Sequence, residues 1–407
     1  MLFNSLTFLV FFAVVLALHG LHISWRARKF NLLVASCIFY AAWNPPYLLL
    51  IWFSTVVDWY AARFLHRATT LLGRRFWLCV SLSTNLGLLA FFKYGNFLLD
   101  NFISIVQHLG INYQPVRIDV LLPVGISFYT FQTLSYTIDV YRRRLEPWNS
   151  FLDFTLFVTF FPQLVAGPIV RAIDFLWQCA TPRRANLDQL GWGLSLMCVG
   201  LFEKVVIADG MLAQVTEKVY DVGAPMGVAD AWIGTLAFSS QIFCDFAGYS
   251  TTAIGVAMCL GFALPDNFHF PYAAIGFSDF WQRWHISLSS WLRDYLYFSL
   301  GGNRAGHVRT LQNLIITMFL GGLWHGAAWT FVVWGLLHGV YLVAERLIRL
   351  RFGGAAIWST TPARVFLALL TFLLVCLAWV PFRAATFARA PKSSRPCLAT
   401  PALTACS

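Results

Sequence analysis

One histidine in the second half of the sequence stands among residues that suit chemistry. His325 lies in GGLWHGAAW (321–329), flanked by glycines, a tryptophan and small apolar residues. Imidazole has an unperturbed pKa of about 6.5, which suits a general base at neutral pH. Gly322 and Gly326 would let another backbone or a ligand approach it closely. His338 has similar glycine neighbours, so the residues alone rank it only slightly below His325 as a functional histidine.

A second group of ionisable side chains lies upstream. The stretch FWQRWHISLSSWLRDYLY (280–297) carries Arg283, His285, Arg293 and Asp294. On one continuous helix His285, Ser289 and Arg293 would share a face. A charge at membrane depth costs at least about 2.5–3.5 kcal/mol, so these groups would face a polar cavity or one another. An amphipathic helix at the membrane interface, with snorkelling arginines, is the alternative that the composition leaves open.

One carboxylate stands inside a long apolar segment. Asp245 lies in CDFAGYS (244–250), and an intramembrane carboxylate is either functional or the buried partner of a cation. We favour the structural pairing and expect Arg283 or Arg293 as its partner. Glu203 and Lys204 lie in another apolar run, where the end of a membrane span would accommodate them.

The composition identifies the medium in which these residues lie. The chain has 407 residues, of which 58% are hydrophobic and 12% charged, against roughly 25% charged residues in soluble domains. The composition therefore predicts an integral membrane protein with many spans. The net charge of +11 comes from arginines in short loops between apolar runs, the pattern of cytoplasmic loops. We therefore expect contact with membrane lipid and no nucleic-acid partner.

Several apolar segments do not fit as single spans of about 20 residues. Residues 31–43 and 46–61 are too short, and the sequence Asn44-Pro45-Pro46 between them predicts a helix break. Residues 229–263 and 311–345 are each long enough for two helices or one tilted helix. Four glycines within these two segments are the expected points of breakage or close packing: Gly248, Gly255, Gly335 and Gly339. We expect one membrane domain over 1–383 and a disordered or truncated tail over 384–407.

Four motifs carry a family resemblance. They are LLPVGISFYTFQTLSYTIDVYR (121–142), FFPQLVAGPIVR (160–171), DFWQRWHISLSSWLRDYLYFSLGGNR (279–304) and LGGLWHGAAW (320–329). Together they resemble the membrane-bound O-acyltransferase family, in the bacterial branch that contains alginate O-acetylase and the D-alanyl transferase of teichoic acids. The likeness to alginate O-acetylase is the stronger of the two.

The resemblance implies an all-α polytopic fold, a ring of tilted and broken transmembrane helices around a central catalytic funnel. In that family an acyl group passes from a cytoplasmic thioester to a hydroxyl. The catalytic histidine of the family matches His325, and a second motif histidine matches His285. Relatives commonly have a serine and an aspartate where this chain has Ala247 and Thr251, so no catalytic role is expected for that segment.

The resulting hypothesis is a multi-pass enzyme of the bacterial inner membrane. It would acetylate hydroxyls of an exported polysaccharide, alginate or a similar exopolysaccharide, with periplasmic polysaccharide-acetylation proteins as partners. Acetyl-CoA or another acyl thioester would be the donor, with no bound cofactor and no metal site. His325 would be the general base, and His285 would orient the acceptor or stabilise the oxyanion. The residues expected to bind substrate are Trp324, Arg293, Asp294, Arg283, Gly322 and Gly326.

Two alternatives stay open from the sequence. A polytopic transporter or flippase would also contain broken helices and polar intramembrane residues. It commonly repeats its broken helices in two halves, and the sequence has no second copy of Asn44-Pro45-Pro46. D-alanyl transfer to teichoic acid is the other alternative, and it would require an acyl-carrier protein as partner.

Overall fold

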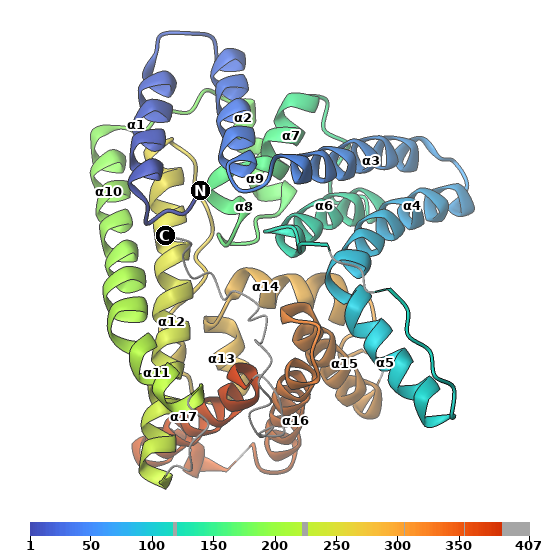
Figure 1. The fold of residues 1–407 in the computed structure, drawn as a ribbon, viewed down its shortest axis with the longest axis vertical. Coiled ribbons are helices and arrows are strands. Elements are labelled where there is room, and N and C mark those ends of the chain that lie inside the picture. The colour runs from blue at the N-terminus through green and yellow to red at the C-terminus, as the bar shows by residue number, and fades with distance from the viewer. Residues whose placement is uncertain (117–119, 222–226, 305, 354, 385–407) are drawn as a thin grey trace.

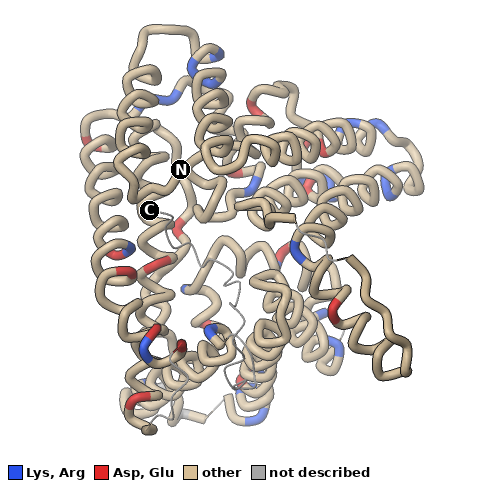
Figure 2. The backbone as a smooth tube through the Cα atoms, viewed as in Figure 1, with Lys and Arg blue, Asp and Glu red and all other residues tan. Residues whose placement is uncertain are grey.

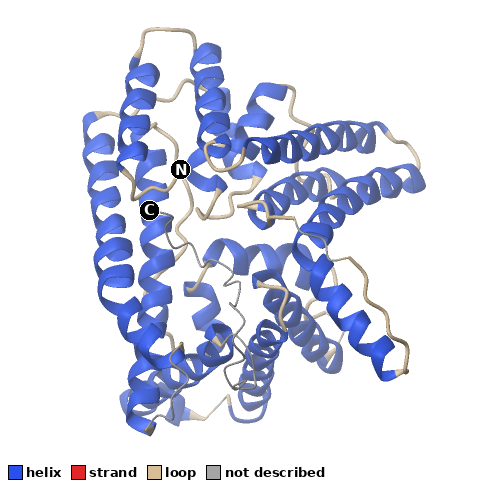
Figure 3. Cartoon of the chain, viewed as in Figure 1, coloured by secondary structure: helices blue, strands red, loops and turns tan. Residues whose placement is uncertain are grey.

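A computed structural model describes residues 1–116, 120–221, 227–304, 306–353 and 355–384 of the chain. Within these ranges the regular structure is helical and no β-strand occurs (Figure 3). The predicted all-α fold is therefore confirmed. Apart from Ala384, the tail expected to be disordered or truncated lies outside the described residues.

Several helices are long and apolar enough to cross a membrane. They are the stretches Pro45–Arg67, Leu71–His108, Val228–Cys259, Trp329–Phe352 and Thr361–Arg383. In Figure 2 long stretches of backbone carry no charged residue, and basic residues gather where α3 ends and α4 begins. Length, composition and charge placement together make the chain a multi-pass membrane protein.

The first part of the chain forms the upper and right-hand side of the molecule in Figure 1. Its elements are α1 (Leu6–Gly20), α2 (Trp25–Ala41), η1 (Pro45–Tyr47), α3 (Leu48–Arg67), α4 (Leu71–Leu89), the π-helical η2 (Ala90–Tyr94), α5 (Gly95–His108) and α6 (Ile126–Tyr141). The predicted break at the two prolines is confirmed, because α2 ends at Ala41 and a single 3-10 turn precedes α3. In Figure 1, α3 leaves this corner in a direction different from that of α2.

The middle of the chain begins with short helices and ends with long ones. The elements are α7 (Phe151–Thr159), α8 (Phe161–Leu164), α9 (Ala172–Ala180), α10 (Leu187–Leu201), the π-helical η3 (Phe202–Leu212), α11 (Ala213–Tyr220) and α12 (Val228–Cys259). Residues 153–164 are all buried, so α7 and α8 belong to the protein core and do not face lipid.

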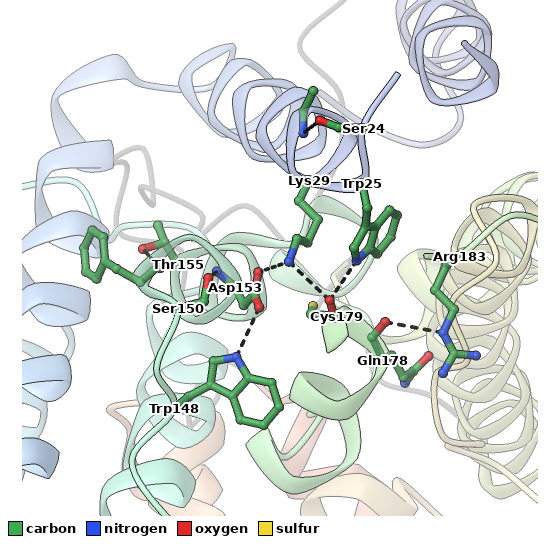
Figure 4. Close-up of polar contacts among 12 residues, drawn as sticks. Ser24, Trp25, Lys29, Trp148, Ser150, Asp153, Thr155, Gln178, Cys179 and Arg183 are labelled. Carbon is green, nitrogen blue, oxygen red and sulfur yellow. Dashed lines mark hydrogen bonds and ion pairs between the residues drawn. The ribbon is translucent and has the colours of Figure 1, made fainter. Parts of the chain in front are cut away.

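A buried ion pair fastens α2 to these short helices (Figure 4). The ammonium of Lys29 lies 2.5 Å from a carboxylate oxygen of Asp153 at the start of α7. It also donates a hydrogen bond of 3.2 Å to the carbonyl of Cys179 on α9. The indole N–H of Trp25 donates to the same carbonyl at 2.8 Å. The pair is buried and hydrogen-bonded, as a charge in a protein interior must be.

Two glycine pairs bring α10 and α12 into close contact. A Cβ added to Gly193 would lie 2.8 Å from the carbonyl oxygen of Gly255, and one added to Gly200 would collide with the backbone of Gly248. The segment predicted over 229–263 is thus one unbroken helix, α12, and its glycines are packing points.

The last part of the chain forms the centre and the lower side of the molecule in Figure 1. Its elements are η4 (Pro271–Ala273), α13 (Phe277–Arg283), α14 (Ile286–Trp291), the π-helical η5 (Leu292–Tyr297), α15 (His307–His325), α16 (Trp329–Phe352), η6 (Ala356–Ser359) and α17 (Thr361–Arg383). The short helices α13 and α14 lie centrally, and the longer helices lie around them (Figure 1). This is the predicted ring of tilted and broken helices.

Candidate functional site

The break between α15 and α16 places His325. Gly326 is extended, with φ −167° and ψ 156°, so α15 ends at His325 and α16 begins at Trp329. The two helices then run close together, because a Cβ on Gly322 would lie 3.0 Å from the Cα of Gly335. The segment predicted over 311–345 is therefore broken at residues 326–328, while Gly335 lies within an unbroken α16.

Aromatic rings hold the imidazole of His325 on three sides. Its ring centroid lies 4.9 Å from that of Trp324, 4.8 Å from that of Trp334 and 5.2 Å from that of Phe382, with the rings nearly perpendicular. Phe382 belongs to α17, so the last described helix contributes to the surroundings of this histidine. Such packing fixes the direction of the imidazole.

His285 lies in a strained turn between α13 and α14. Its φ of 44° and ψ of 55° fall in the left-handed region, which is uncommon for a residue other than glycine. Two backbone hydrogen bonds hold the turn, one of 2.9 Å from His269 to the carbonyl of Arg283 and one of 2.9 Å from Ile286 to the carbonyl of Asn267. Backbone strain of this kind is often found at functional sites.

The turn corrects one sequence-based expectation. Because the helix is interrupted at His285, this residue, Ser289 and Arg293 do not share a face. His285 is 1% exposed, whereas the side chain of Arg293 is 57% exposed.

A cavity of about 340 Å³ joins the two histidines. Its lining includes His285 and His325 together with Trp324, whose ring centroid lies 5.9 Å from that of His285 and 4.9 Å from that of His325. Most of the remaining lining residues come from the N-terminus, η2, α6, α10, η3, α12 and α17, and they include Asn4, Lys93, Ser127, Lys204, Asp245, Tyr249 and Thr252. His338 is fully buried among aromatic rings and is not among the lining residues. The structure therefore distinguishes His325, which lines the cavity, from His338, although the sequence ranked the two almost equally as functional histidines.

Lys93 is a cationic residue of the cavity that the sequence reasoning missed. Its ammonium donates hydrogen bonds to the carbonyl of Trp324 and, at 3.2 Å, to the hydroxyl of Ser127. It lies in the π-helical η2, and π-helical turns are frequent at functional sites. The signal was available, because a lysine in the apolar run AFFKYGNF (90–97) is an ionisable residue within a membrane span.

Asp245 also lines the cavity, with a partner other than the expected one. It forms an ion pair with Lys204 of η3, which also lies 3.0 Å from Asp209. The expected pairing with Arg283 or Arg293 was wrong, because η3 packs against α12 and brings Lys204 to Asp245. Neither Ala247 nor Thr251 lines the cavity.

The charged residues predicted to bind substrate lie elsewhere. Arg283 pairs with Asp279 at 2.7 Å. Arg293 and Arg171 both pair with Asp294, at 2.7 Å and 2.8 Å. None of these lines the cavity, so the geometry gives Arg283, Arg293 and Asp294 structural partners, and substrate binding by them stays a prediction.

Hydrogen bonding also sets the charge of Asp294. Partial burial alone would raise the pKa of this carboxyl, but the hydrogen bonds and the positive charges of Arg293 and Arg171 together outweigh that effect. The pKa of Asp294 therefore lies below its usual range, which suits a structural anion.

Gly322 and Gly326, which were predicted to bind substrate, allow close contacts between α15 and α16. Gly322 faces the backbone of Gly335, and a Cβ on Gly326 would collide with the ring of Phe331. Neither is among the lining residues of the cavity. A neighbouring helix or ring occupies the space beside each, and substrate binding by these glycines stays a prediction. Of the residues predicted to bind substrate, Trp324 is the one that the structure brings to both histidines.

No group of three or more His, Cys, Asp and Glu side chains that could hold a metal ion occurs in the part of the chain that the structure describes. The cavity combines two imidazoles, the ammonium of Lys93, the Lys204–Asp245 ion pair and aromatic walls. An imidazole can take a proton from a hydroxyl, and an ammonium can stabilise a developing oxyanion. This set of groups suits acyl transfer to a hydroxyl.

Comparison with known proteins points to the same chemistry. The sequence profile of the membrane-bound O-acyltransferase family matches residues 138–380, more than half of the chain. A probable alginate O-acetylase of Azotobacter vinelandii is 42% identical over 386 residues, which cover 94% of this chain and 75% of the relative. The Pseudomonas aeruginosa protein of that description is 42% identical over 387 residues, 94% and 72% of the two chains. A peptidoglycan O-acetyltransferase of Helicobacter pylori is 38% identical over 382 residues, 88% and 71% of the two chains.

Proposed function

Because the chain belongs to the membrane-bound O-acyltransferase family and is an O-acyltransferase, we propose that it transfers acetyl groups to an exported bacterial polysaccharide. The acceptor is alginate or a similar exopolysaccharide, and the enzyme lies in the bacterial inner membrane. The donor is acetyl-CoA or another acyl thioester from the cytoplasm. Periplasmic polysaccharide-acetylation proteins are the proposed partners.

The observation that carries this proposal is the shared cavity of His325 and His285. Family membership decides against the transporter or flippase. The names of the relatives at 38–42% identity, alginate O-acetylase and peptidoglycan O-acetyltransferase, support acetyl as the transferred group over D-alanyl. They also support a polysaccharide as the acceptor.

In the proposed reaction His325 is the general base. The acceptor oxygen attacks the carbonyl carbon of the thioester, forming a new C–O bond, while the hydroxyl proton passes to the imidazole of His325. The carbonyl oxygen carries the negative charge until the C–S bond breaks. The departing thiolate then takes the proton from the imidazolium, which leaves an ester and a thiol as products.

Lys93 is the proposed stabiliser of the oxyanion. Two of the three N–H groups of its ammonium are used by Trp324 and Ser127, which leaves one for the developing charge. The ammonium lies 5.5 Å from the centroid of the Trp324 ring, and a charge beside apolar rings acts at a lower dielectric, where it is worth more than in water.

The test is the acetyl content of the exported polysaccharide in cells that carry His325→Ala. General-base help is worth about 10²–10⁴-fold, so acetylation is expected to fall to background while the protein stays at its normal level in the membrane. His22→Ala, at an exposed histidine outside the cavity lining, is the matched control and is expected to acetylate normally. Wild-type acetylation by His325→Ala would refute the assigned role.

A further inference from the structure

Asn267 lies at the centre of a buried hydrogen-bond network beside the cavity. It is 2% exposed and belongs to the segment NFHFPY (267–272), which has no part in the proposed reaction. Its side-chain oxygen lies 3.1 Å from Nδ1 of His285, 3.2 Å from the backbone N–H of Ser287 and 2.9 Å from the hydroxyl of Ser287. Its amide nitrogen donates to the hydroxyl of Ser250 at 3.0 Å.

The network fixes which end of the amide faces His285. A backbone N–H can only donate, so the side-chain atom of Asn267 that meets Ser287 N–H is the oxygen. The hydroxyl of Ser287 accepts a hydrogen bond of 2.9 Å from the backbone N–H of Ile169. Its own proton is then directed to the Asn267 oxygen, at 2.9 Å, in preference to Nδ1 of His285, at 3.4 Å.

The orientation of the amide determines the tautomer of His285. An oxygen that faces Nδ1 accepts, so Nδ1 carries the proton. In the neutral ring Nε2 then carries a lone pair and can only accept a hydrogen bond. Nε2 is buried, and it has no hydrogen-bond partner among the residues that the structure describes. Because His285 lines the cavity, its unused acceptor is available to a donor from a bound substrate.

We propose that Asn267 is a positioning residue that holds His285 in the Nδ1-protonated tautomer, so that Nε2 accepts a hydrogen bond from the hydroxyl-bearing acceptor. This inference rests on the proposed function. It decides between the two roles considered for His285, because a neutral ring without a proton on Nε2 orients the acceptor and cannot donate to an oxyanion. The oxyanion is left to the ammonium of Lys93.

The proton count gives the source of this hydrogen bond. The attacking hydroxyl has one proton, and in the proposed reaction His325 takes it. The hydrogen bond to Nε2 of His285 therefore comes from a second hydroxyl of the acceptor, such as a neighbouring hydroxyl of the same sugar ring. The site would thus select acceptors that carry adjacent hydroxyls.

The test uses full-length protein in lipid nanodiscs, acetyl-CoA as donor and alkali-deacetylated polysaccharide of the same bacterium as acceptor. Asn267→Leu removes the oxygen at similar volume, and the loss of one buried hydrogen-bond partner predicts a roughly 10- to 100-fold fall in kcat/KM for the acceptor. The KM for acetyl-CoA is expected to stay unchanged. Asn267→Asp keeps an acceptor oxygen beside Nδ1, as a carboxylate does in other imidazole sites, and is expected to stay within about threefold of wild type.

A double-mutant cycle separates positioning from folding. If Asn267 acts through His285, Asn267→Leu causes no further loss in the His285→Ala background, whereas a general loss of structure multiplies the two effects. Equal losses in Asn267→Leu and Asn267→Asp, or multiplied losses in the double variant, would overturn the proposal. Normal activity of His285→Ala would instead refute the place of His285 in the proposed function. The two failures are therefore distinguishable.

Discussion

The contact between α15 and α16 makes the position of His325 sensitive to a single methyl group. In Gly322→Ala the new Cβ would lie 3.0 Å from the Cα and 3.1 Å from the nitrogen of Gly335, and closer still to the carbonyl oxygen of Phe331. All three atoms are backbone, so no side chain can rotate away. The two helices must separate by several tenths of an ångström.

The magnitude follows from the position of the glycine. Overpacking of a tight contact costs typically about 1–3 kcal/mol. His325 lies three residues after Gly322 at the end of the same helix, so the shift reaches the imidazole. Misplacement of a catalytic group by ~1 Å can cost about 10²-fold in rate, and a shift of a few tenths predicts a loss nearer tenfold.

The assay measures thiol release from acetyl-CoA and the melting temperature of the protein in detergent. Gly191→Ala is the matched control, because this helical glycine of α10 has no atom within 4 Å of the added Cβ. It is expected to melt at or slightly above the wild-type temperature, since Gly-to-Ala changes without strain stabilise by about 0.4–1 kcal/mol. Wild-type activity and melting of Gly322→Ala would refute the reasoning. Gly335→Ala places a methyl group on the α16 side of the same contact and is expected to lower activity and melting temperature in the same way.

Three further predictions concern charged side chains. Lys29→Met leaves the buried carboxylate of Asp153 without its cation and is expected to destabilise the protein by about 3 kcal/mol. The double variant with Asp153→Leu is expected to recover much of this loss in a detergent melting assay. Equal melting temperatures of the single and double variants would contradict this prediction. Lys93→Gln removes the ammonium from the cavity and is expected to lower kcat on the order of 10²-fold. Lys93→Arg is the comparison that preserves the charge. Unchanged turnover of Lys93→Gln would refute the prediction. Arg293→Ala, at an exposed side chain, is expected to change stability by less than about 0.5 kcal/mol and to keep normal acetylation; a raised KM for either substrate would show instead that Arg293 binds it.

His325 and His338 show what the local sequence can predict about a functional histidine and what it cannot. Glycine neighbours and an apolar setting identified His325 and His338 as candidates, and the family motifs selected His325. The residues could not exclude His338, because both histidines lie in similar local surroundings. Packing decides this, since His338 is enclosed by Phe280, Trp281 and Trp334 while His325 meets the cavity.

The partners of charged groups were harder to predict than the groups themselves. Asp245 was recognised as a carboxylate that needs a cation, but Lys204 reaches it only because η3 packs against α12. Lys93 and Trp324 are separated by 231 residues in the chain, and no local pattern connects them. The interrupted helix at His285 depends on backbone hydrogen bonds between residues 283 and 286 and the distant residues 269 and 267, so the prediction of one continuous helix placed Arg293 on the wrong face.

The sequence by itself determined the membrane environment, the helical fold class, the break at Pro45 and the identity of the two motif histidines. These properties depend on composition and on residues close together in the chain, where hydropathy, proline geometry and short motifs act directly. The tertiary structure decided which side chains share the cavity, that Gly322 lets α15 and α16 approach closely, and that Asn267 sets the tautomer of His285. Such contacts join distant segments, and their distances follow from how whole helices pack, which neighbouring residues in a sequence do not specify.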